Sequence, residues 1–126
     1  MSVKFKATPK KNPRDLNATP KFYPTVVSDG EYTLKELSER IAEMSTVSRP
    51  DTLAALQSLV LILPKVLAQG KIVRLGDLGS LRLVIKGEGA DDEKKLQSSS
   101  ITSIKIIFTP GKEIKEALLT IVFEKI

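Results

Sequence analysis

The sequence predicts an α+β fold in one small domain that carries a basic N-terminal extension. Apolar residues recur at spacings of three and four over residues 34–44 and 52–68, which predicts two helices. They alternate with polar residues over 80–86 and 101–108, which predicts half-buried strands. With 126 residues, 41% of them apolar, the chain is long enough for a single hydrophobic core.

The N-terminal segment holds the whole basic excess of the chain. The formal net charge is +5, yet residues 28–126 contain equal numbers of basic and acidic side chains. Lysine and arginine attract nucleic acid because they release the counterions that are condensed on its phosphates. We therefore expect a basic extension over residues 1–32 and a domain over residues 33–126.

Two short strands are expected within this extension. Val3 to Lys6 alternates apolar and charged residues, and Lys21 to Val27 is a second extended piece that Pro24 confines to a sheet edge. The basic cluster between these positions could belong in part to a structural strand, or it could follow the phosphates of DNA. Both interpretations stay open for Lys4, Lys6, Lys10, Lys11 and Arg14.

Two helices are expected next. Thr33 and Glu36 form a capping box ahead of the first, in which each side chain satisfies a free backbone N–H. Ser48 with Asp51 caps the second, which runs over residues 52–68 and is apolar nearly all round. Such a helix has to be covered on nearly all sides, and a domain of this size cannot easily cover it. We therefore expect a homodimer with an interface at Leu53, Leu56, Leu59, Val60, Leu63 and Leu67.

The stretch LGDLGSLRL, residues 75–83, places Gly76 and Gly79 between two expected strands. A P-loop would continue with Lys and Ser or Thr into a helix, and a KH-type RNA clamp would join two helices. Neither condition is met here, so the remaining interpretation is a tight turn, in which glycine adopts backbone angles forbidden to other residues. This turn would connect the strand Lys71–Leu75 to the strand Ser80–Lys86.

The second half of the chain predicts a protruding β-arm. The strands over 80–86 and 101–108 are separated by residues 87–100, which are polar and have no apolar periodicity. Two alternating strands joined by a long polar tip would project from the body of the domain.

The C-terminal part predicts one more helix and one more strand. The helix is expected over 109–121, with Thr109 as its N-cap and Pro110 in its first turn. The closing residues, 122–126, are expected to form a strand that could pair with Val3–Lys6 and so tie the extension to the rest of the chain.

The composition argues against catalysis. The chain has neither cysteine nor histidine, which removes thiol nucleophiles, disulfides, zinc sites and the usual general base near neutral pH. We expect no enzyme, no cofactor, no metal site and no small-molecule substrate. No apolar run approaches the roughly 20 residues that span a bilayer, and the N-terminus lacks the apolar region of a secretory signal. We therefore expect a cytoplasmic protein without a membrane partner.

The order of the expected elements resembles the bacterial histone-like DNA-binding family of HU and integration host factor. The resemblance covers about residues 33–120, and the N-terminal extension is similar to that of a longer HU-like subgroup. Three stretches carry it: TLKELSERIAEMSTVSRPDTLAALQSLVLILPKVLAQGKIVRL, GDLGSLRL and IIFTPGKEIKEAL. It implies an HU-like fold of two N-terminal helices, a three-stranded antiparallel sheet with a β-arm hairpin and a C-terminal helix, with the extra terminal strands added.

The resemblance also implies a partner and a set of contacts. Family members are intertwined homodimers or closely related heterodimers whose β-arms reach around the minor groove of double-stranded DNA and bend it with little base specificity. Basic residues on the outer face of the arm, at its tip, at the start of the last helix and in the extension are then candidate phosphate contacts, against the alternative of solvated surface charges. They are Arg82, Lys86, Lys105, Lys94, Lys95, Lys112, Lys115, Lys10, Lys11 and Arg14.

The tip of the arm departs from the family pattern. Family arms are rich in arginine and end in a proline that wedges between base pairs, whereas residues 87–100 hold four acidic residues, two lysines and no proline. Phosphates repel such a tip, so kinking of DNA by a wedge is not expected. The sequence predicts a histone-like, nucleoid-associated protein that contacts the DNA backbone; the alternative is a structural or protein-interaction module that has lost the DNA-bending arm.

Overall fold

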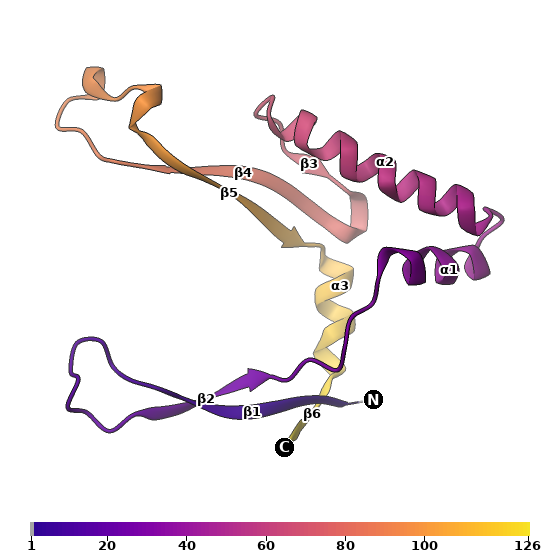
Figure 1. Ribbon diagram of the computed structural model, residues 1–126, viewed down its shortest axis with the longest axis horizontal. Helices are drawn as coiled ribbons and strands as arrows, with labels where there is room; N and C mark the ends of the chain where they lie inside the picture. Colours follow the sequence, from indigo (N-terminus) through magenta and orange to yellow (C-terminus); the bar gives the residue numbers. More distant parts are fainter. Residues whose placement is uncertain (1) are drawn as a thin grey trace. The chain divides into compact units, whose positions relative to one another are not determined.

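The computed structural model describes residues 2–126, which fold into two compact units (Figure 1). The first unit consists of residues 2–33 together with Leu118–Ile126, and the second is Leu34–Ala117. Each unit contains one three-stranded sheet, and helices complete the second unit. The α+β class predicted from the sequence is therefore confirmed.

The sheet of the first unit joins the two ends of the chain. It has the order β2-β1-β6, with β1 at Ser2–Lys10, β2 at Lys21–Val26 and β6 at Val122–Lys125. Strand β1 is antiparallel to β2 and parallel to β6. The predicted pairing of the last strand with the N-terminal strand is confirmed. Pro24 lies in the edge strand β2, where a missing backbone donor is tolerated.

Helices α1 (Leu34–Met44) and α2 (Arg49–Leu67) open the second unit. The Ser48 hydroxyl accepts a hydrogen bond from the Asp51 backbone N–H at 3.2 Å, which confirms the predicted cap of α2. The first helical residue after this cap is Arg49, so α2 begins three residues before the predicted start at Thr52. It then continues through Pro64 to its end.

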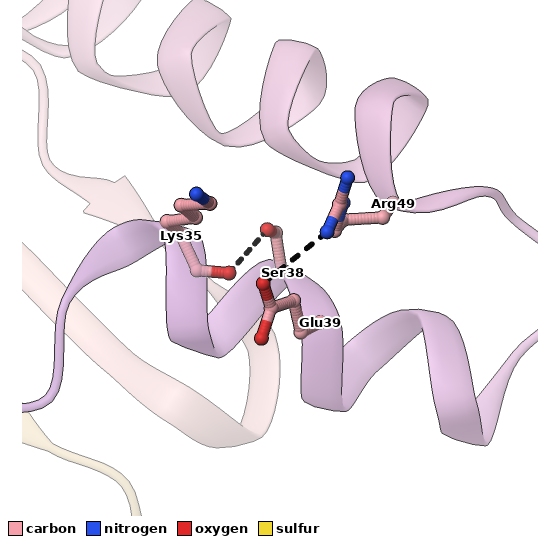
Figure 2. Close-up of polar contacts among 4 residues, drawn as sticks. All are labelled: Lys35, Ser38, Glu39 and Arg49. Atoms are coloured by element: carbon pink, nitrogen blue, oxygen red, sulfur yellow. Dashed lines mark hydrogen bonds and ion pairs between the residues drawn. The ribbon is translucent and has the colours of Figure 1, made fainter.

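The two helices approach each other at a small residue. Ser38 of α1 is completely buried and lies on the side of α1 that faces α2 (Figure 2). Its hydroxyl donates a hydrogen bond to the Lys35 carbonyl oxygen at 2.6 Å, so that no buried polar group is left without a partner there. Arg49 and Glu39 form an ion pair across the helices at 3.4 Å, and because both side chains are about half exposed this pair contributes little to stability.

Helix α2 leaves part of its apolar surface uncovered in a single chain. Among residues 2–126, Leu67 is the one apolar side chain that is buried, whereas Val60 is 58% and Leu61 69% exposed. An 18-residue stretch of α2 has a mean hydropathy of 1.3, so by length and composition α2 could cross a membrane, which corrects the expectation that no apolar segment of this chain is long enough. Core helices of globular proteins can have the same length and composition, so these two properties do not place α2 in a membrane.

The sheet of the second unit forms the predicted β-arm (Figure 1). Its order is β3-β4-β5, all antiparallel, with β3 at Val73–Arg74, β4 at Gly79–Gly87 and β5 at Ile101–Pro110. Two short 3-10 helices, at Glu93–Lys95 and Ser98–Ser100, shape the polar tip between β4 and β5.

The glycine pair forms the structural turn that the sequence predicted. Gly76 and Gly79 have positive φ angles of 61° and 138°, in the region that favours glycine. A 3-10 helix at Gly76–Leu78 lies between β3 and β4, and the Leu75 N–H donates to the Gly79 carbonyl oxygen at 2.8 Å. A Cβ atom on Gly79 would collide with the Thr109 carbonyl oxygen on the neighbouring strand.

The last helix is much shorter than predicted. Thr109 and Pro110 do not start the helix but extend β5, where Pro110 pairs with Gly79. Strand pairing is favoured over helix at these two residues because the Gly111 N–H donates to the Leu78 carbonyl oxygen at 3.0 Å. This hydrogen bond keeps the chain beside the glycine turn up to Gly111, so the helix begins only after it. Helix α3 spans Lys112–Ala117, and a 3-10 helix at Leu118–Thr120 leads into β6.

The glycine turn gives a direct test of the fold. Replacing Gly79 by Ala should lower the free energy of unfolding by about 2 to 4 kcal/mol, because the side chain adds backbone strain at a positive φ and a collision with β5. Urea unfolding followed by circular dichroism measures this decrease. Gly89→Ala is the matched control, since a Cβ there meets nothing within 4 Å. Equal stability of the two variants would contradict the assigned turn.

Candidate nucleic-acid interface

Three basic residues share one face of the β-arm. Arg82 and Lys86 lie on β4, and Lys105 on β5 is paired in register with Val84, midway between them. Because side chains of a strand alternate between faces and paired residues point the same way, all three project from the same side of the hairpin. We call Arg82, Lys86 and Lys105 the arm face.

The arm face is exposed and is not neutralised by acidic groups. All three side chains are exposed to solvent. Within residues 2–126, no carboxylate pairs with the arm face; the ion pairs Arg49–Glu39 and Lys112–Glu116 lie on the helices. From the rise of a strand, Arg82 and Lys86 are about 13 Å apart along β4. The arrangement can neutralise several phosphates at once, but it offers no nucleophile or base for chemistry.

The lysines at the tip of the arm have an acidic setting. Lys94 and Lys95 lie in the 3-10 helix that Asp92 caps by accepting a hydrogen bond from the Lys94 backbone N–H at 3.2 Å. Asp91 and Glu93 are their close neighbours in the chain. The tip therefore carries more negative than positive charge, which weakens its attraction for phosphates.

Lys112 and Lys115 lie on α3, but the argument from a helix N-terminus does not apply to them. Helix α3 has six residues, too few for a substantial macrodipole. Lys112 forms an exposed ion pair with Glu116 at 3.7 Å and is itself 86% exposed. Both lysines are available to solvent as ordinary surface charges.

The basic residues of the extension belong to the other unit. Lys10 ends β1, and its ammonium nitrogen is 5.6 Å from the centre of the Tyr23 ring on β2. Lys11 and Arg14 follow in the loop that joins β1 to β2, where the backbone N–H of Arg14 donates to Oδ1 of the Asn12 side chain at 3.0 Å. Lys10 and Lys11 line an open pocket of about 450 Å³.

The pairing of β1 with β2 adds a residue that the sequence analysis did not select. Lys21 is the register partner of Lys10, and both side chains therefore lie on one face of the sheet. The sequence shows that basic residues cluster around the loop, but it does not show which residue of β2 pairs with Lys10. That partner depends on the register of the hairpin.

The predicted interface residues all lie on α2, and a single chain covers them incompletely. Leu67 is buried, Leu53, Leu56, Leu59 and Leu63 are partly covered, and Val60 is exposed.

Across residues 2–126, no three acidic side chains are grouped so that they could hold a metal ion.

Comparison with known proteins shows the family of this chain. The family model HU-HIG, described as an HU domain fused to wHTH, Ig, or Glycine-rich motif, matches residues 1–125, nearly the whole chain. No curated protein matches.

Among solved structures, 8 chains match. One is the 2.25 Å crystal structure of a candidate bacterial DNA-binding protein from Bacteroides vulgatus ATCC 8482, with a TM-score of 0.67 and 13% sequence identity. The alignment covers 99% of this chain and 48% of that one, so this chain spans about half the length of that protein. At this identity the likeness is evidence for the fold alone.

Proposed function

This chain belongs to the HU-HIG family of HU domains fused to other motifs, and from that membership we propose that it binds double-stranded DNA with little dependence on base sequence. In this proposal the protein is architectural: it contacts the phosphate backbone, acts as a dimer and is associated with the nucleoid in the cytoplasm. The absence of cysteine and histidine supports a binding role in place of an enzymatic one.

The observation that carries this proposal is the arm face. It places three exposed cations on one side of a hairpin, without an acidic partner. Contacts from such side chains to phosphate oxygens supply affinity and orientation but do not distinguish bases. The ligand is therefore defined by its backbone charge, as expected for a protein that binds many DNA sequences.

The uncovered surface of α2 supports dimerisation. Contiguous apolar surface on this scale marks a site of association with another protein chain or a membrane. We propose that a second copy, or a closely related chain, covers α2 at Leu53, Leu56, Leu59, Val60 and Leu63, whereas Leu67, the sixth predicted interface residue, is already buried within its own chain. A dimer would also double the number of basic residues available to one DNA duplex.

A second function is favoured by the tip of the arm. Its four acidic residues and the absence of proline suit a structural or protein-interaction module that has kept the fold and lost DNA bending. Within the DNA-binding proposal, the same feature means that the arm does not act as a wedge between base pairs, since neither a proline nor an excess of positive charge is present at its end.

The DNA-binding proposal predicts a change in salt dependence. Replacing Arg82, Lys86 and Lys105 by Gln should make the negative slope of log K against log salt shallower, by about 0.9 for each phosphate that the variant no longer neutralises. Fluorescence anisotropy on a 20-base-pair duplex between 50 and 200 mM salt measures this slope.

The matched control removes three exposed basic residues from the helices, by replacing Lys35, Arg40 and Lys65 with Gln. It should bind DNA nearly as the unmodified protein does. Absence of micromolar binding to duplex even at low salt would contradict the proposal and favour the protein-interaction module.

The dimer proposal predicts a change in mass. The unmodified protein should have twice the 13.8 kDa mass of the chain in detergent-free buffer, and Val60→Glu should shift it to the monomer, because the interface would bury an unpaired carboxylate. Light scattering after size exclusion measures both masses. Leu16→Glu, at an apolar residue that is 75% exposed outside α2, should leave the dimer intact. A monomeric unmodified protein, or one that needs detergent to stay in solution, would contradict this prediction.

A further inference from the structure

The sheet β2-β1-β6 has two chemically different faces. Lys4, Lys6 and Lys10 occupy alternate positions of β1 and so lie on one face, which Lys21 of β2 joins as the register partner of Lys10. We call Lys4, Lys6, Lys10 and Lys21 the lysine face. The opposite face is apolar apart from Lys125 and has register partners such as Phe5 with Val26, Pro9 with Phe22, and Val3 with Phe123.

The apolar face is the one that must be covered. Phe5, Pro24, Val26 and Phe123 line an open hollow of about 410 Å³ on it, and within the single chain Val26 is 63% and Phe123 60% exposed. Removing these side chains from water is favourable, whereas burying unpaired ammonium groups is strongly unfavourable. Whatever covers the sheet therefore lies on its apolar face, and the lysine face is left to solvent.

The charge of the lysine face is not balanced within its unit. Glu124 of β6 is the one acidic residue on this face of the described strands; it accepts a hydrogen bond from the Ser2 hydroxyl at 3.0 Å. None of the four lysines takes part in an ion pair formed within residues 2–126. Their charges are therefore available to an anionic ligand.

The spacing of the lysines fits an extended polyanion better than a single phosphate. From the rise of a strand, Lys4 and Lys6 are about 7 Å apart and Lys4 and Lys10 about 20 Å apart. One strand of a DNA duplex presents a phosphate about every 3.4 Å along the axis, so the row would span about six phosphates. Tyr23, which lies on the same face, holds the Lys10 ammonium group over its ring.

We infer that the lysine face is a second DNA-binding surface of this protein, which contacts the phosphate backbone of a duplex independently of the arm face. This inference rests on the proposed function, because it takes the same ligand. It assigns a role to the N-terminal extension: the extension adds phosphate contacts, and so affinity and site size, without adding base specificity.

The test compares two variants that remove the same amount of positive charge. In the first, Lys4, Lys6, Lys10 and Lys21 are replaced by Gln. In the second, Lys125 on the apolar face of the same sheet is replaced by Gln together with Lys35, Arg40 and Lys65. Circular dichroism checks that both fold. On a 20-base-pair duplex, the first variant should make the negative slope of log K against log salt shallower by about 0.9 for each phosphate no longer neutralised, up to about 3.6 for one chain. The second variant should leave the slope nearly unchanged.

The outcomes separate this inference from the proposed function. If the unmodified protein does not bind duplex, both fail. If it binds and the arm-face variant weakens it, while the two four-charge variants behave alike, the proposed function stands and the lysine face is overturned as a DNA surface. Loss of binding to phosphatidylserine vesicles in the lysine-face variant, with duplex binding unchanged, would also overturn it and assign the face to membranes.

Discussion

Each sheet in this protein has to cover one face with other apolar groups, and that requirement decides which side chains are left for a ligand. In the β-arm, Leu83 pairs with Ile106 on one face while Arg82 and Lys105 occupy the other. In the terminal sheet, Phe5 and Val26 share one face and Lys10 and Lys21 the other. Because side chains alternate along a strand, covering the apolar face leaves the cations together on the outer one.

The same requirement connects the fold to assembly. A single chain buries little apolar surface, and helix α2 still has Leu61 69% exposed. A chain of this kind gains stability by association, since burial of apolar surface is the main favourable contribution to folding and to binding. In the proposed dimer, the contacts that complete the core would also bring two sets of basic residues to one duplex, so that assembly and DNA affinity would depend on each other.

Several elements could be predicted from the sequence because their signals are local. The Ser48 cap, the glycine turn at Gly76 and Gly79, and the alternation along β4 each depend on residues close in the chain. The start of the last helix could not. Thr109 and Pro110 have the composition of a helix start, but hydrogen bonds to the glycine turn, far earlier in the chain, keep them in β5. A long-range ladder overrode a local propensity, which is the usual reason that such signals fail.

The sequence by itself determined the α+β class, the order of the helices and the arm, and the acidic character of the arm tip, because periodicity, caps and charge are properties of neighbouring residues. The tertiary structure decided the parallel direction and the register in which β6 pairs with β1. It also decided that Lys21 lies beside Lys10. These facts depend on strand register, and a shift by one residue would move each side chain to the opposite face.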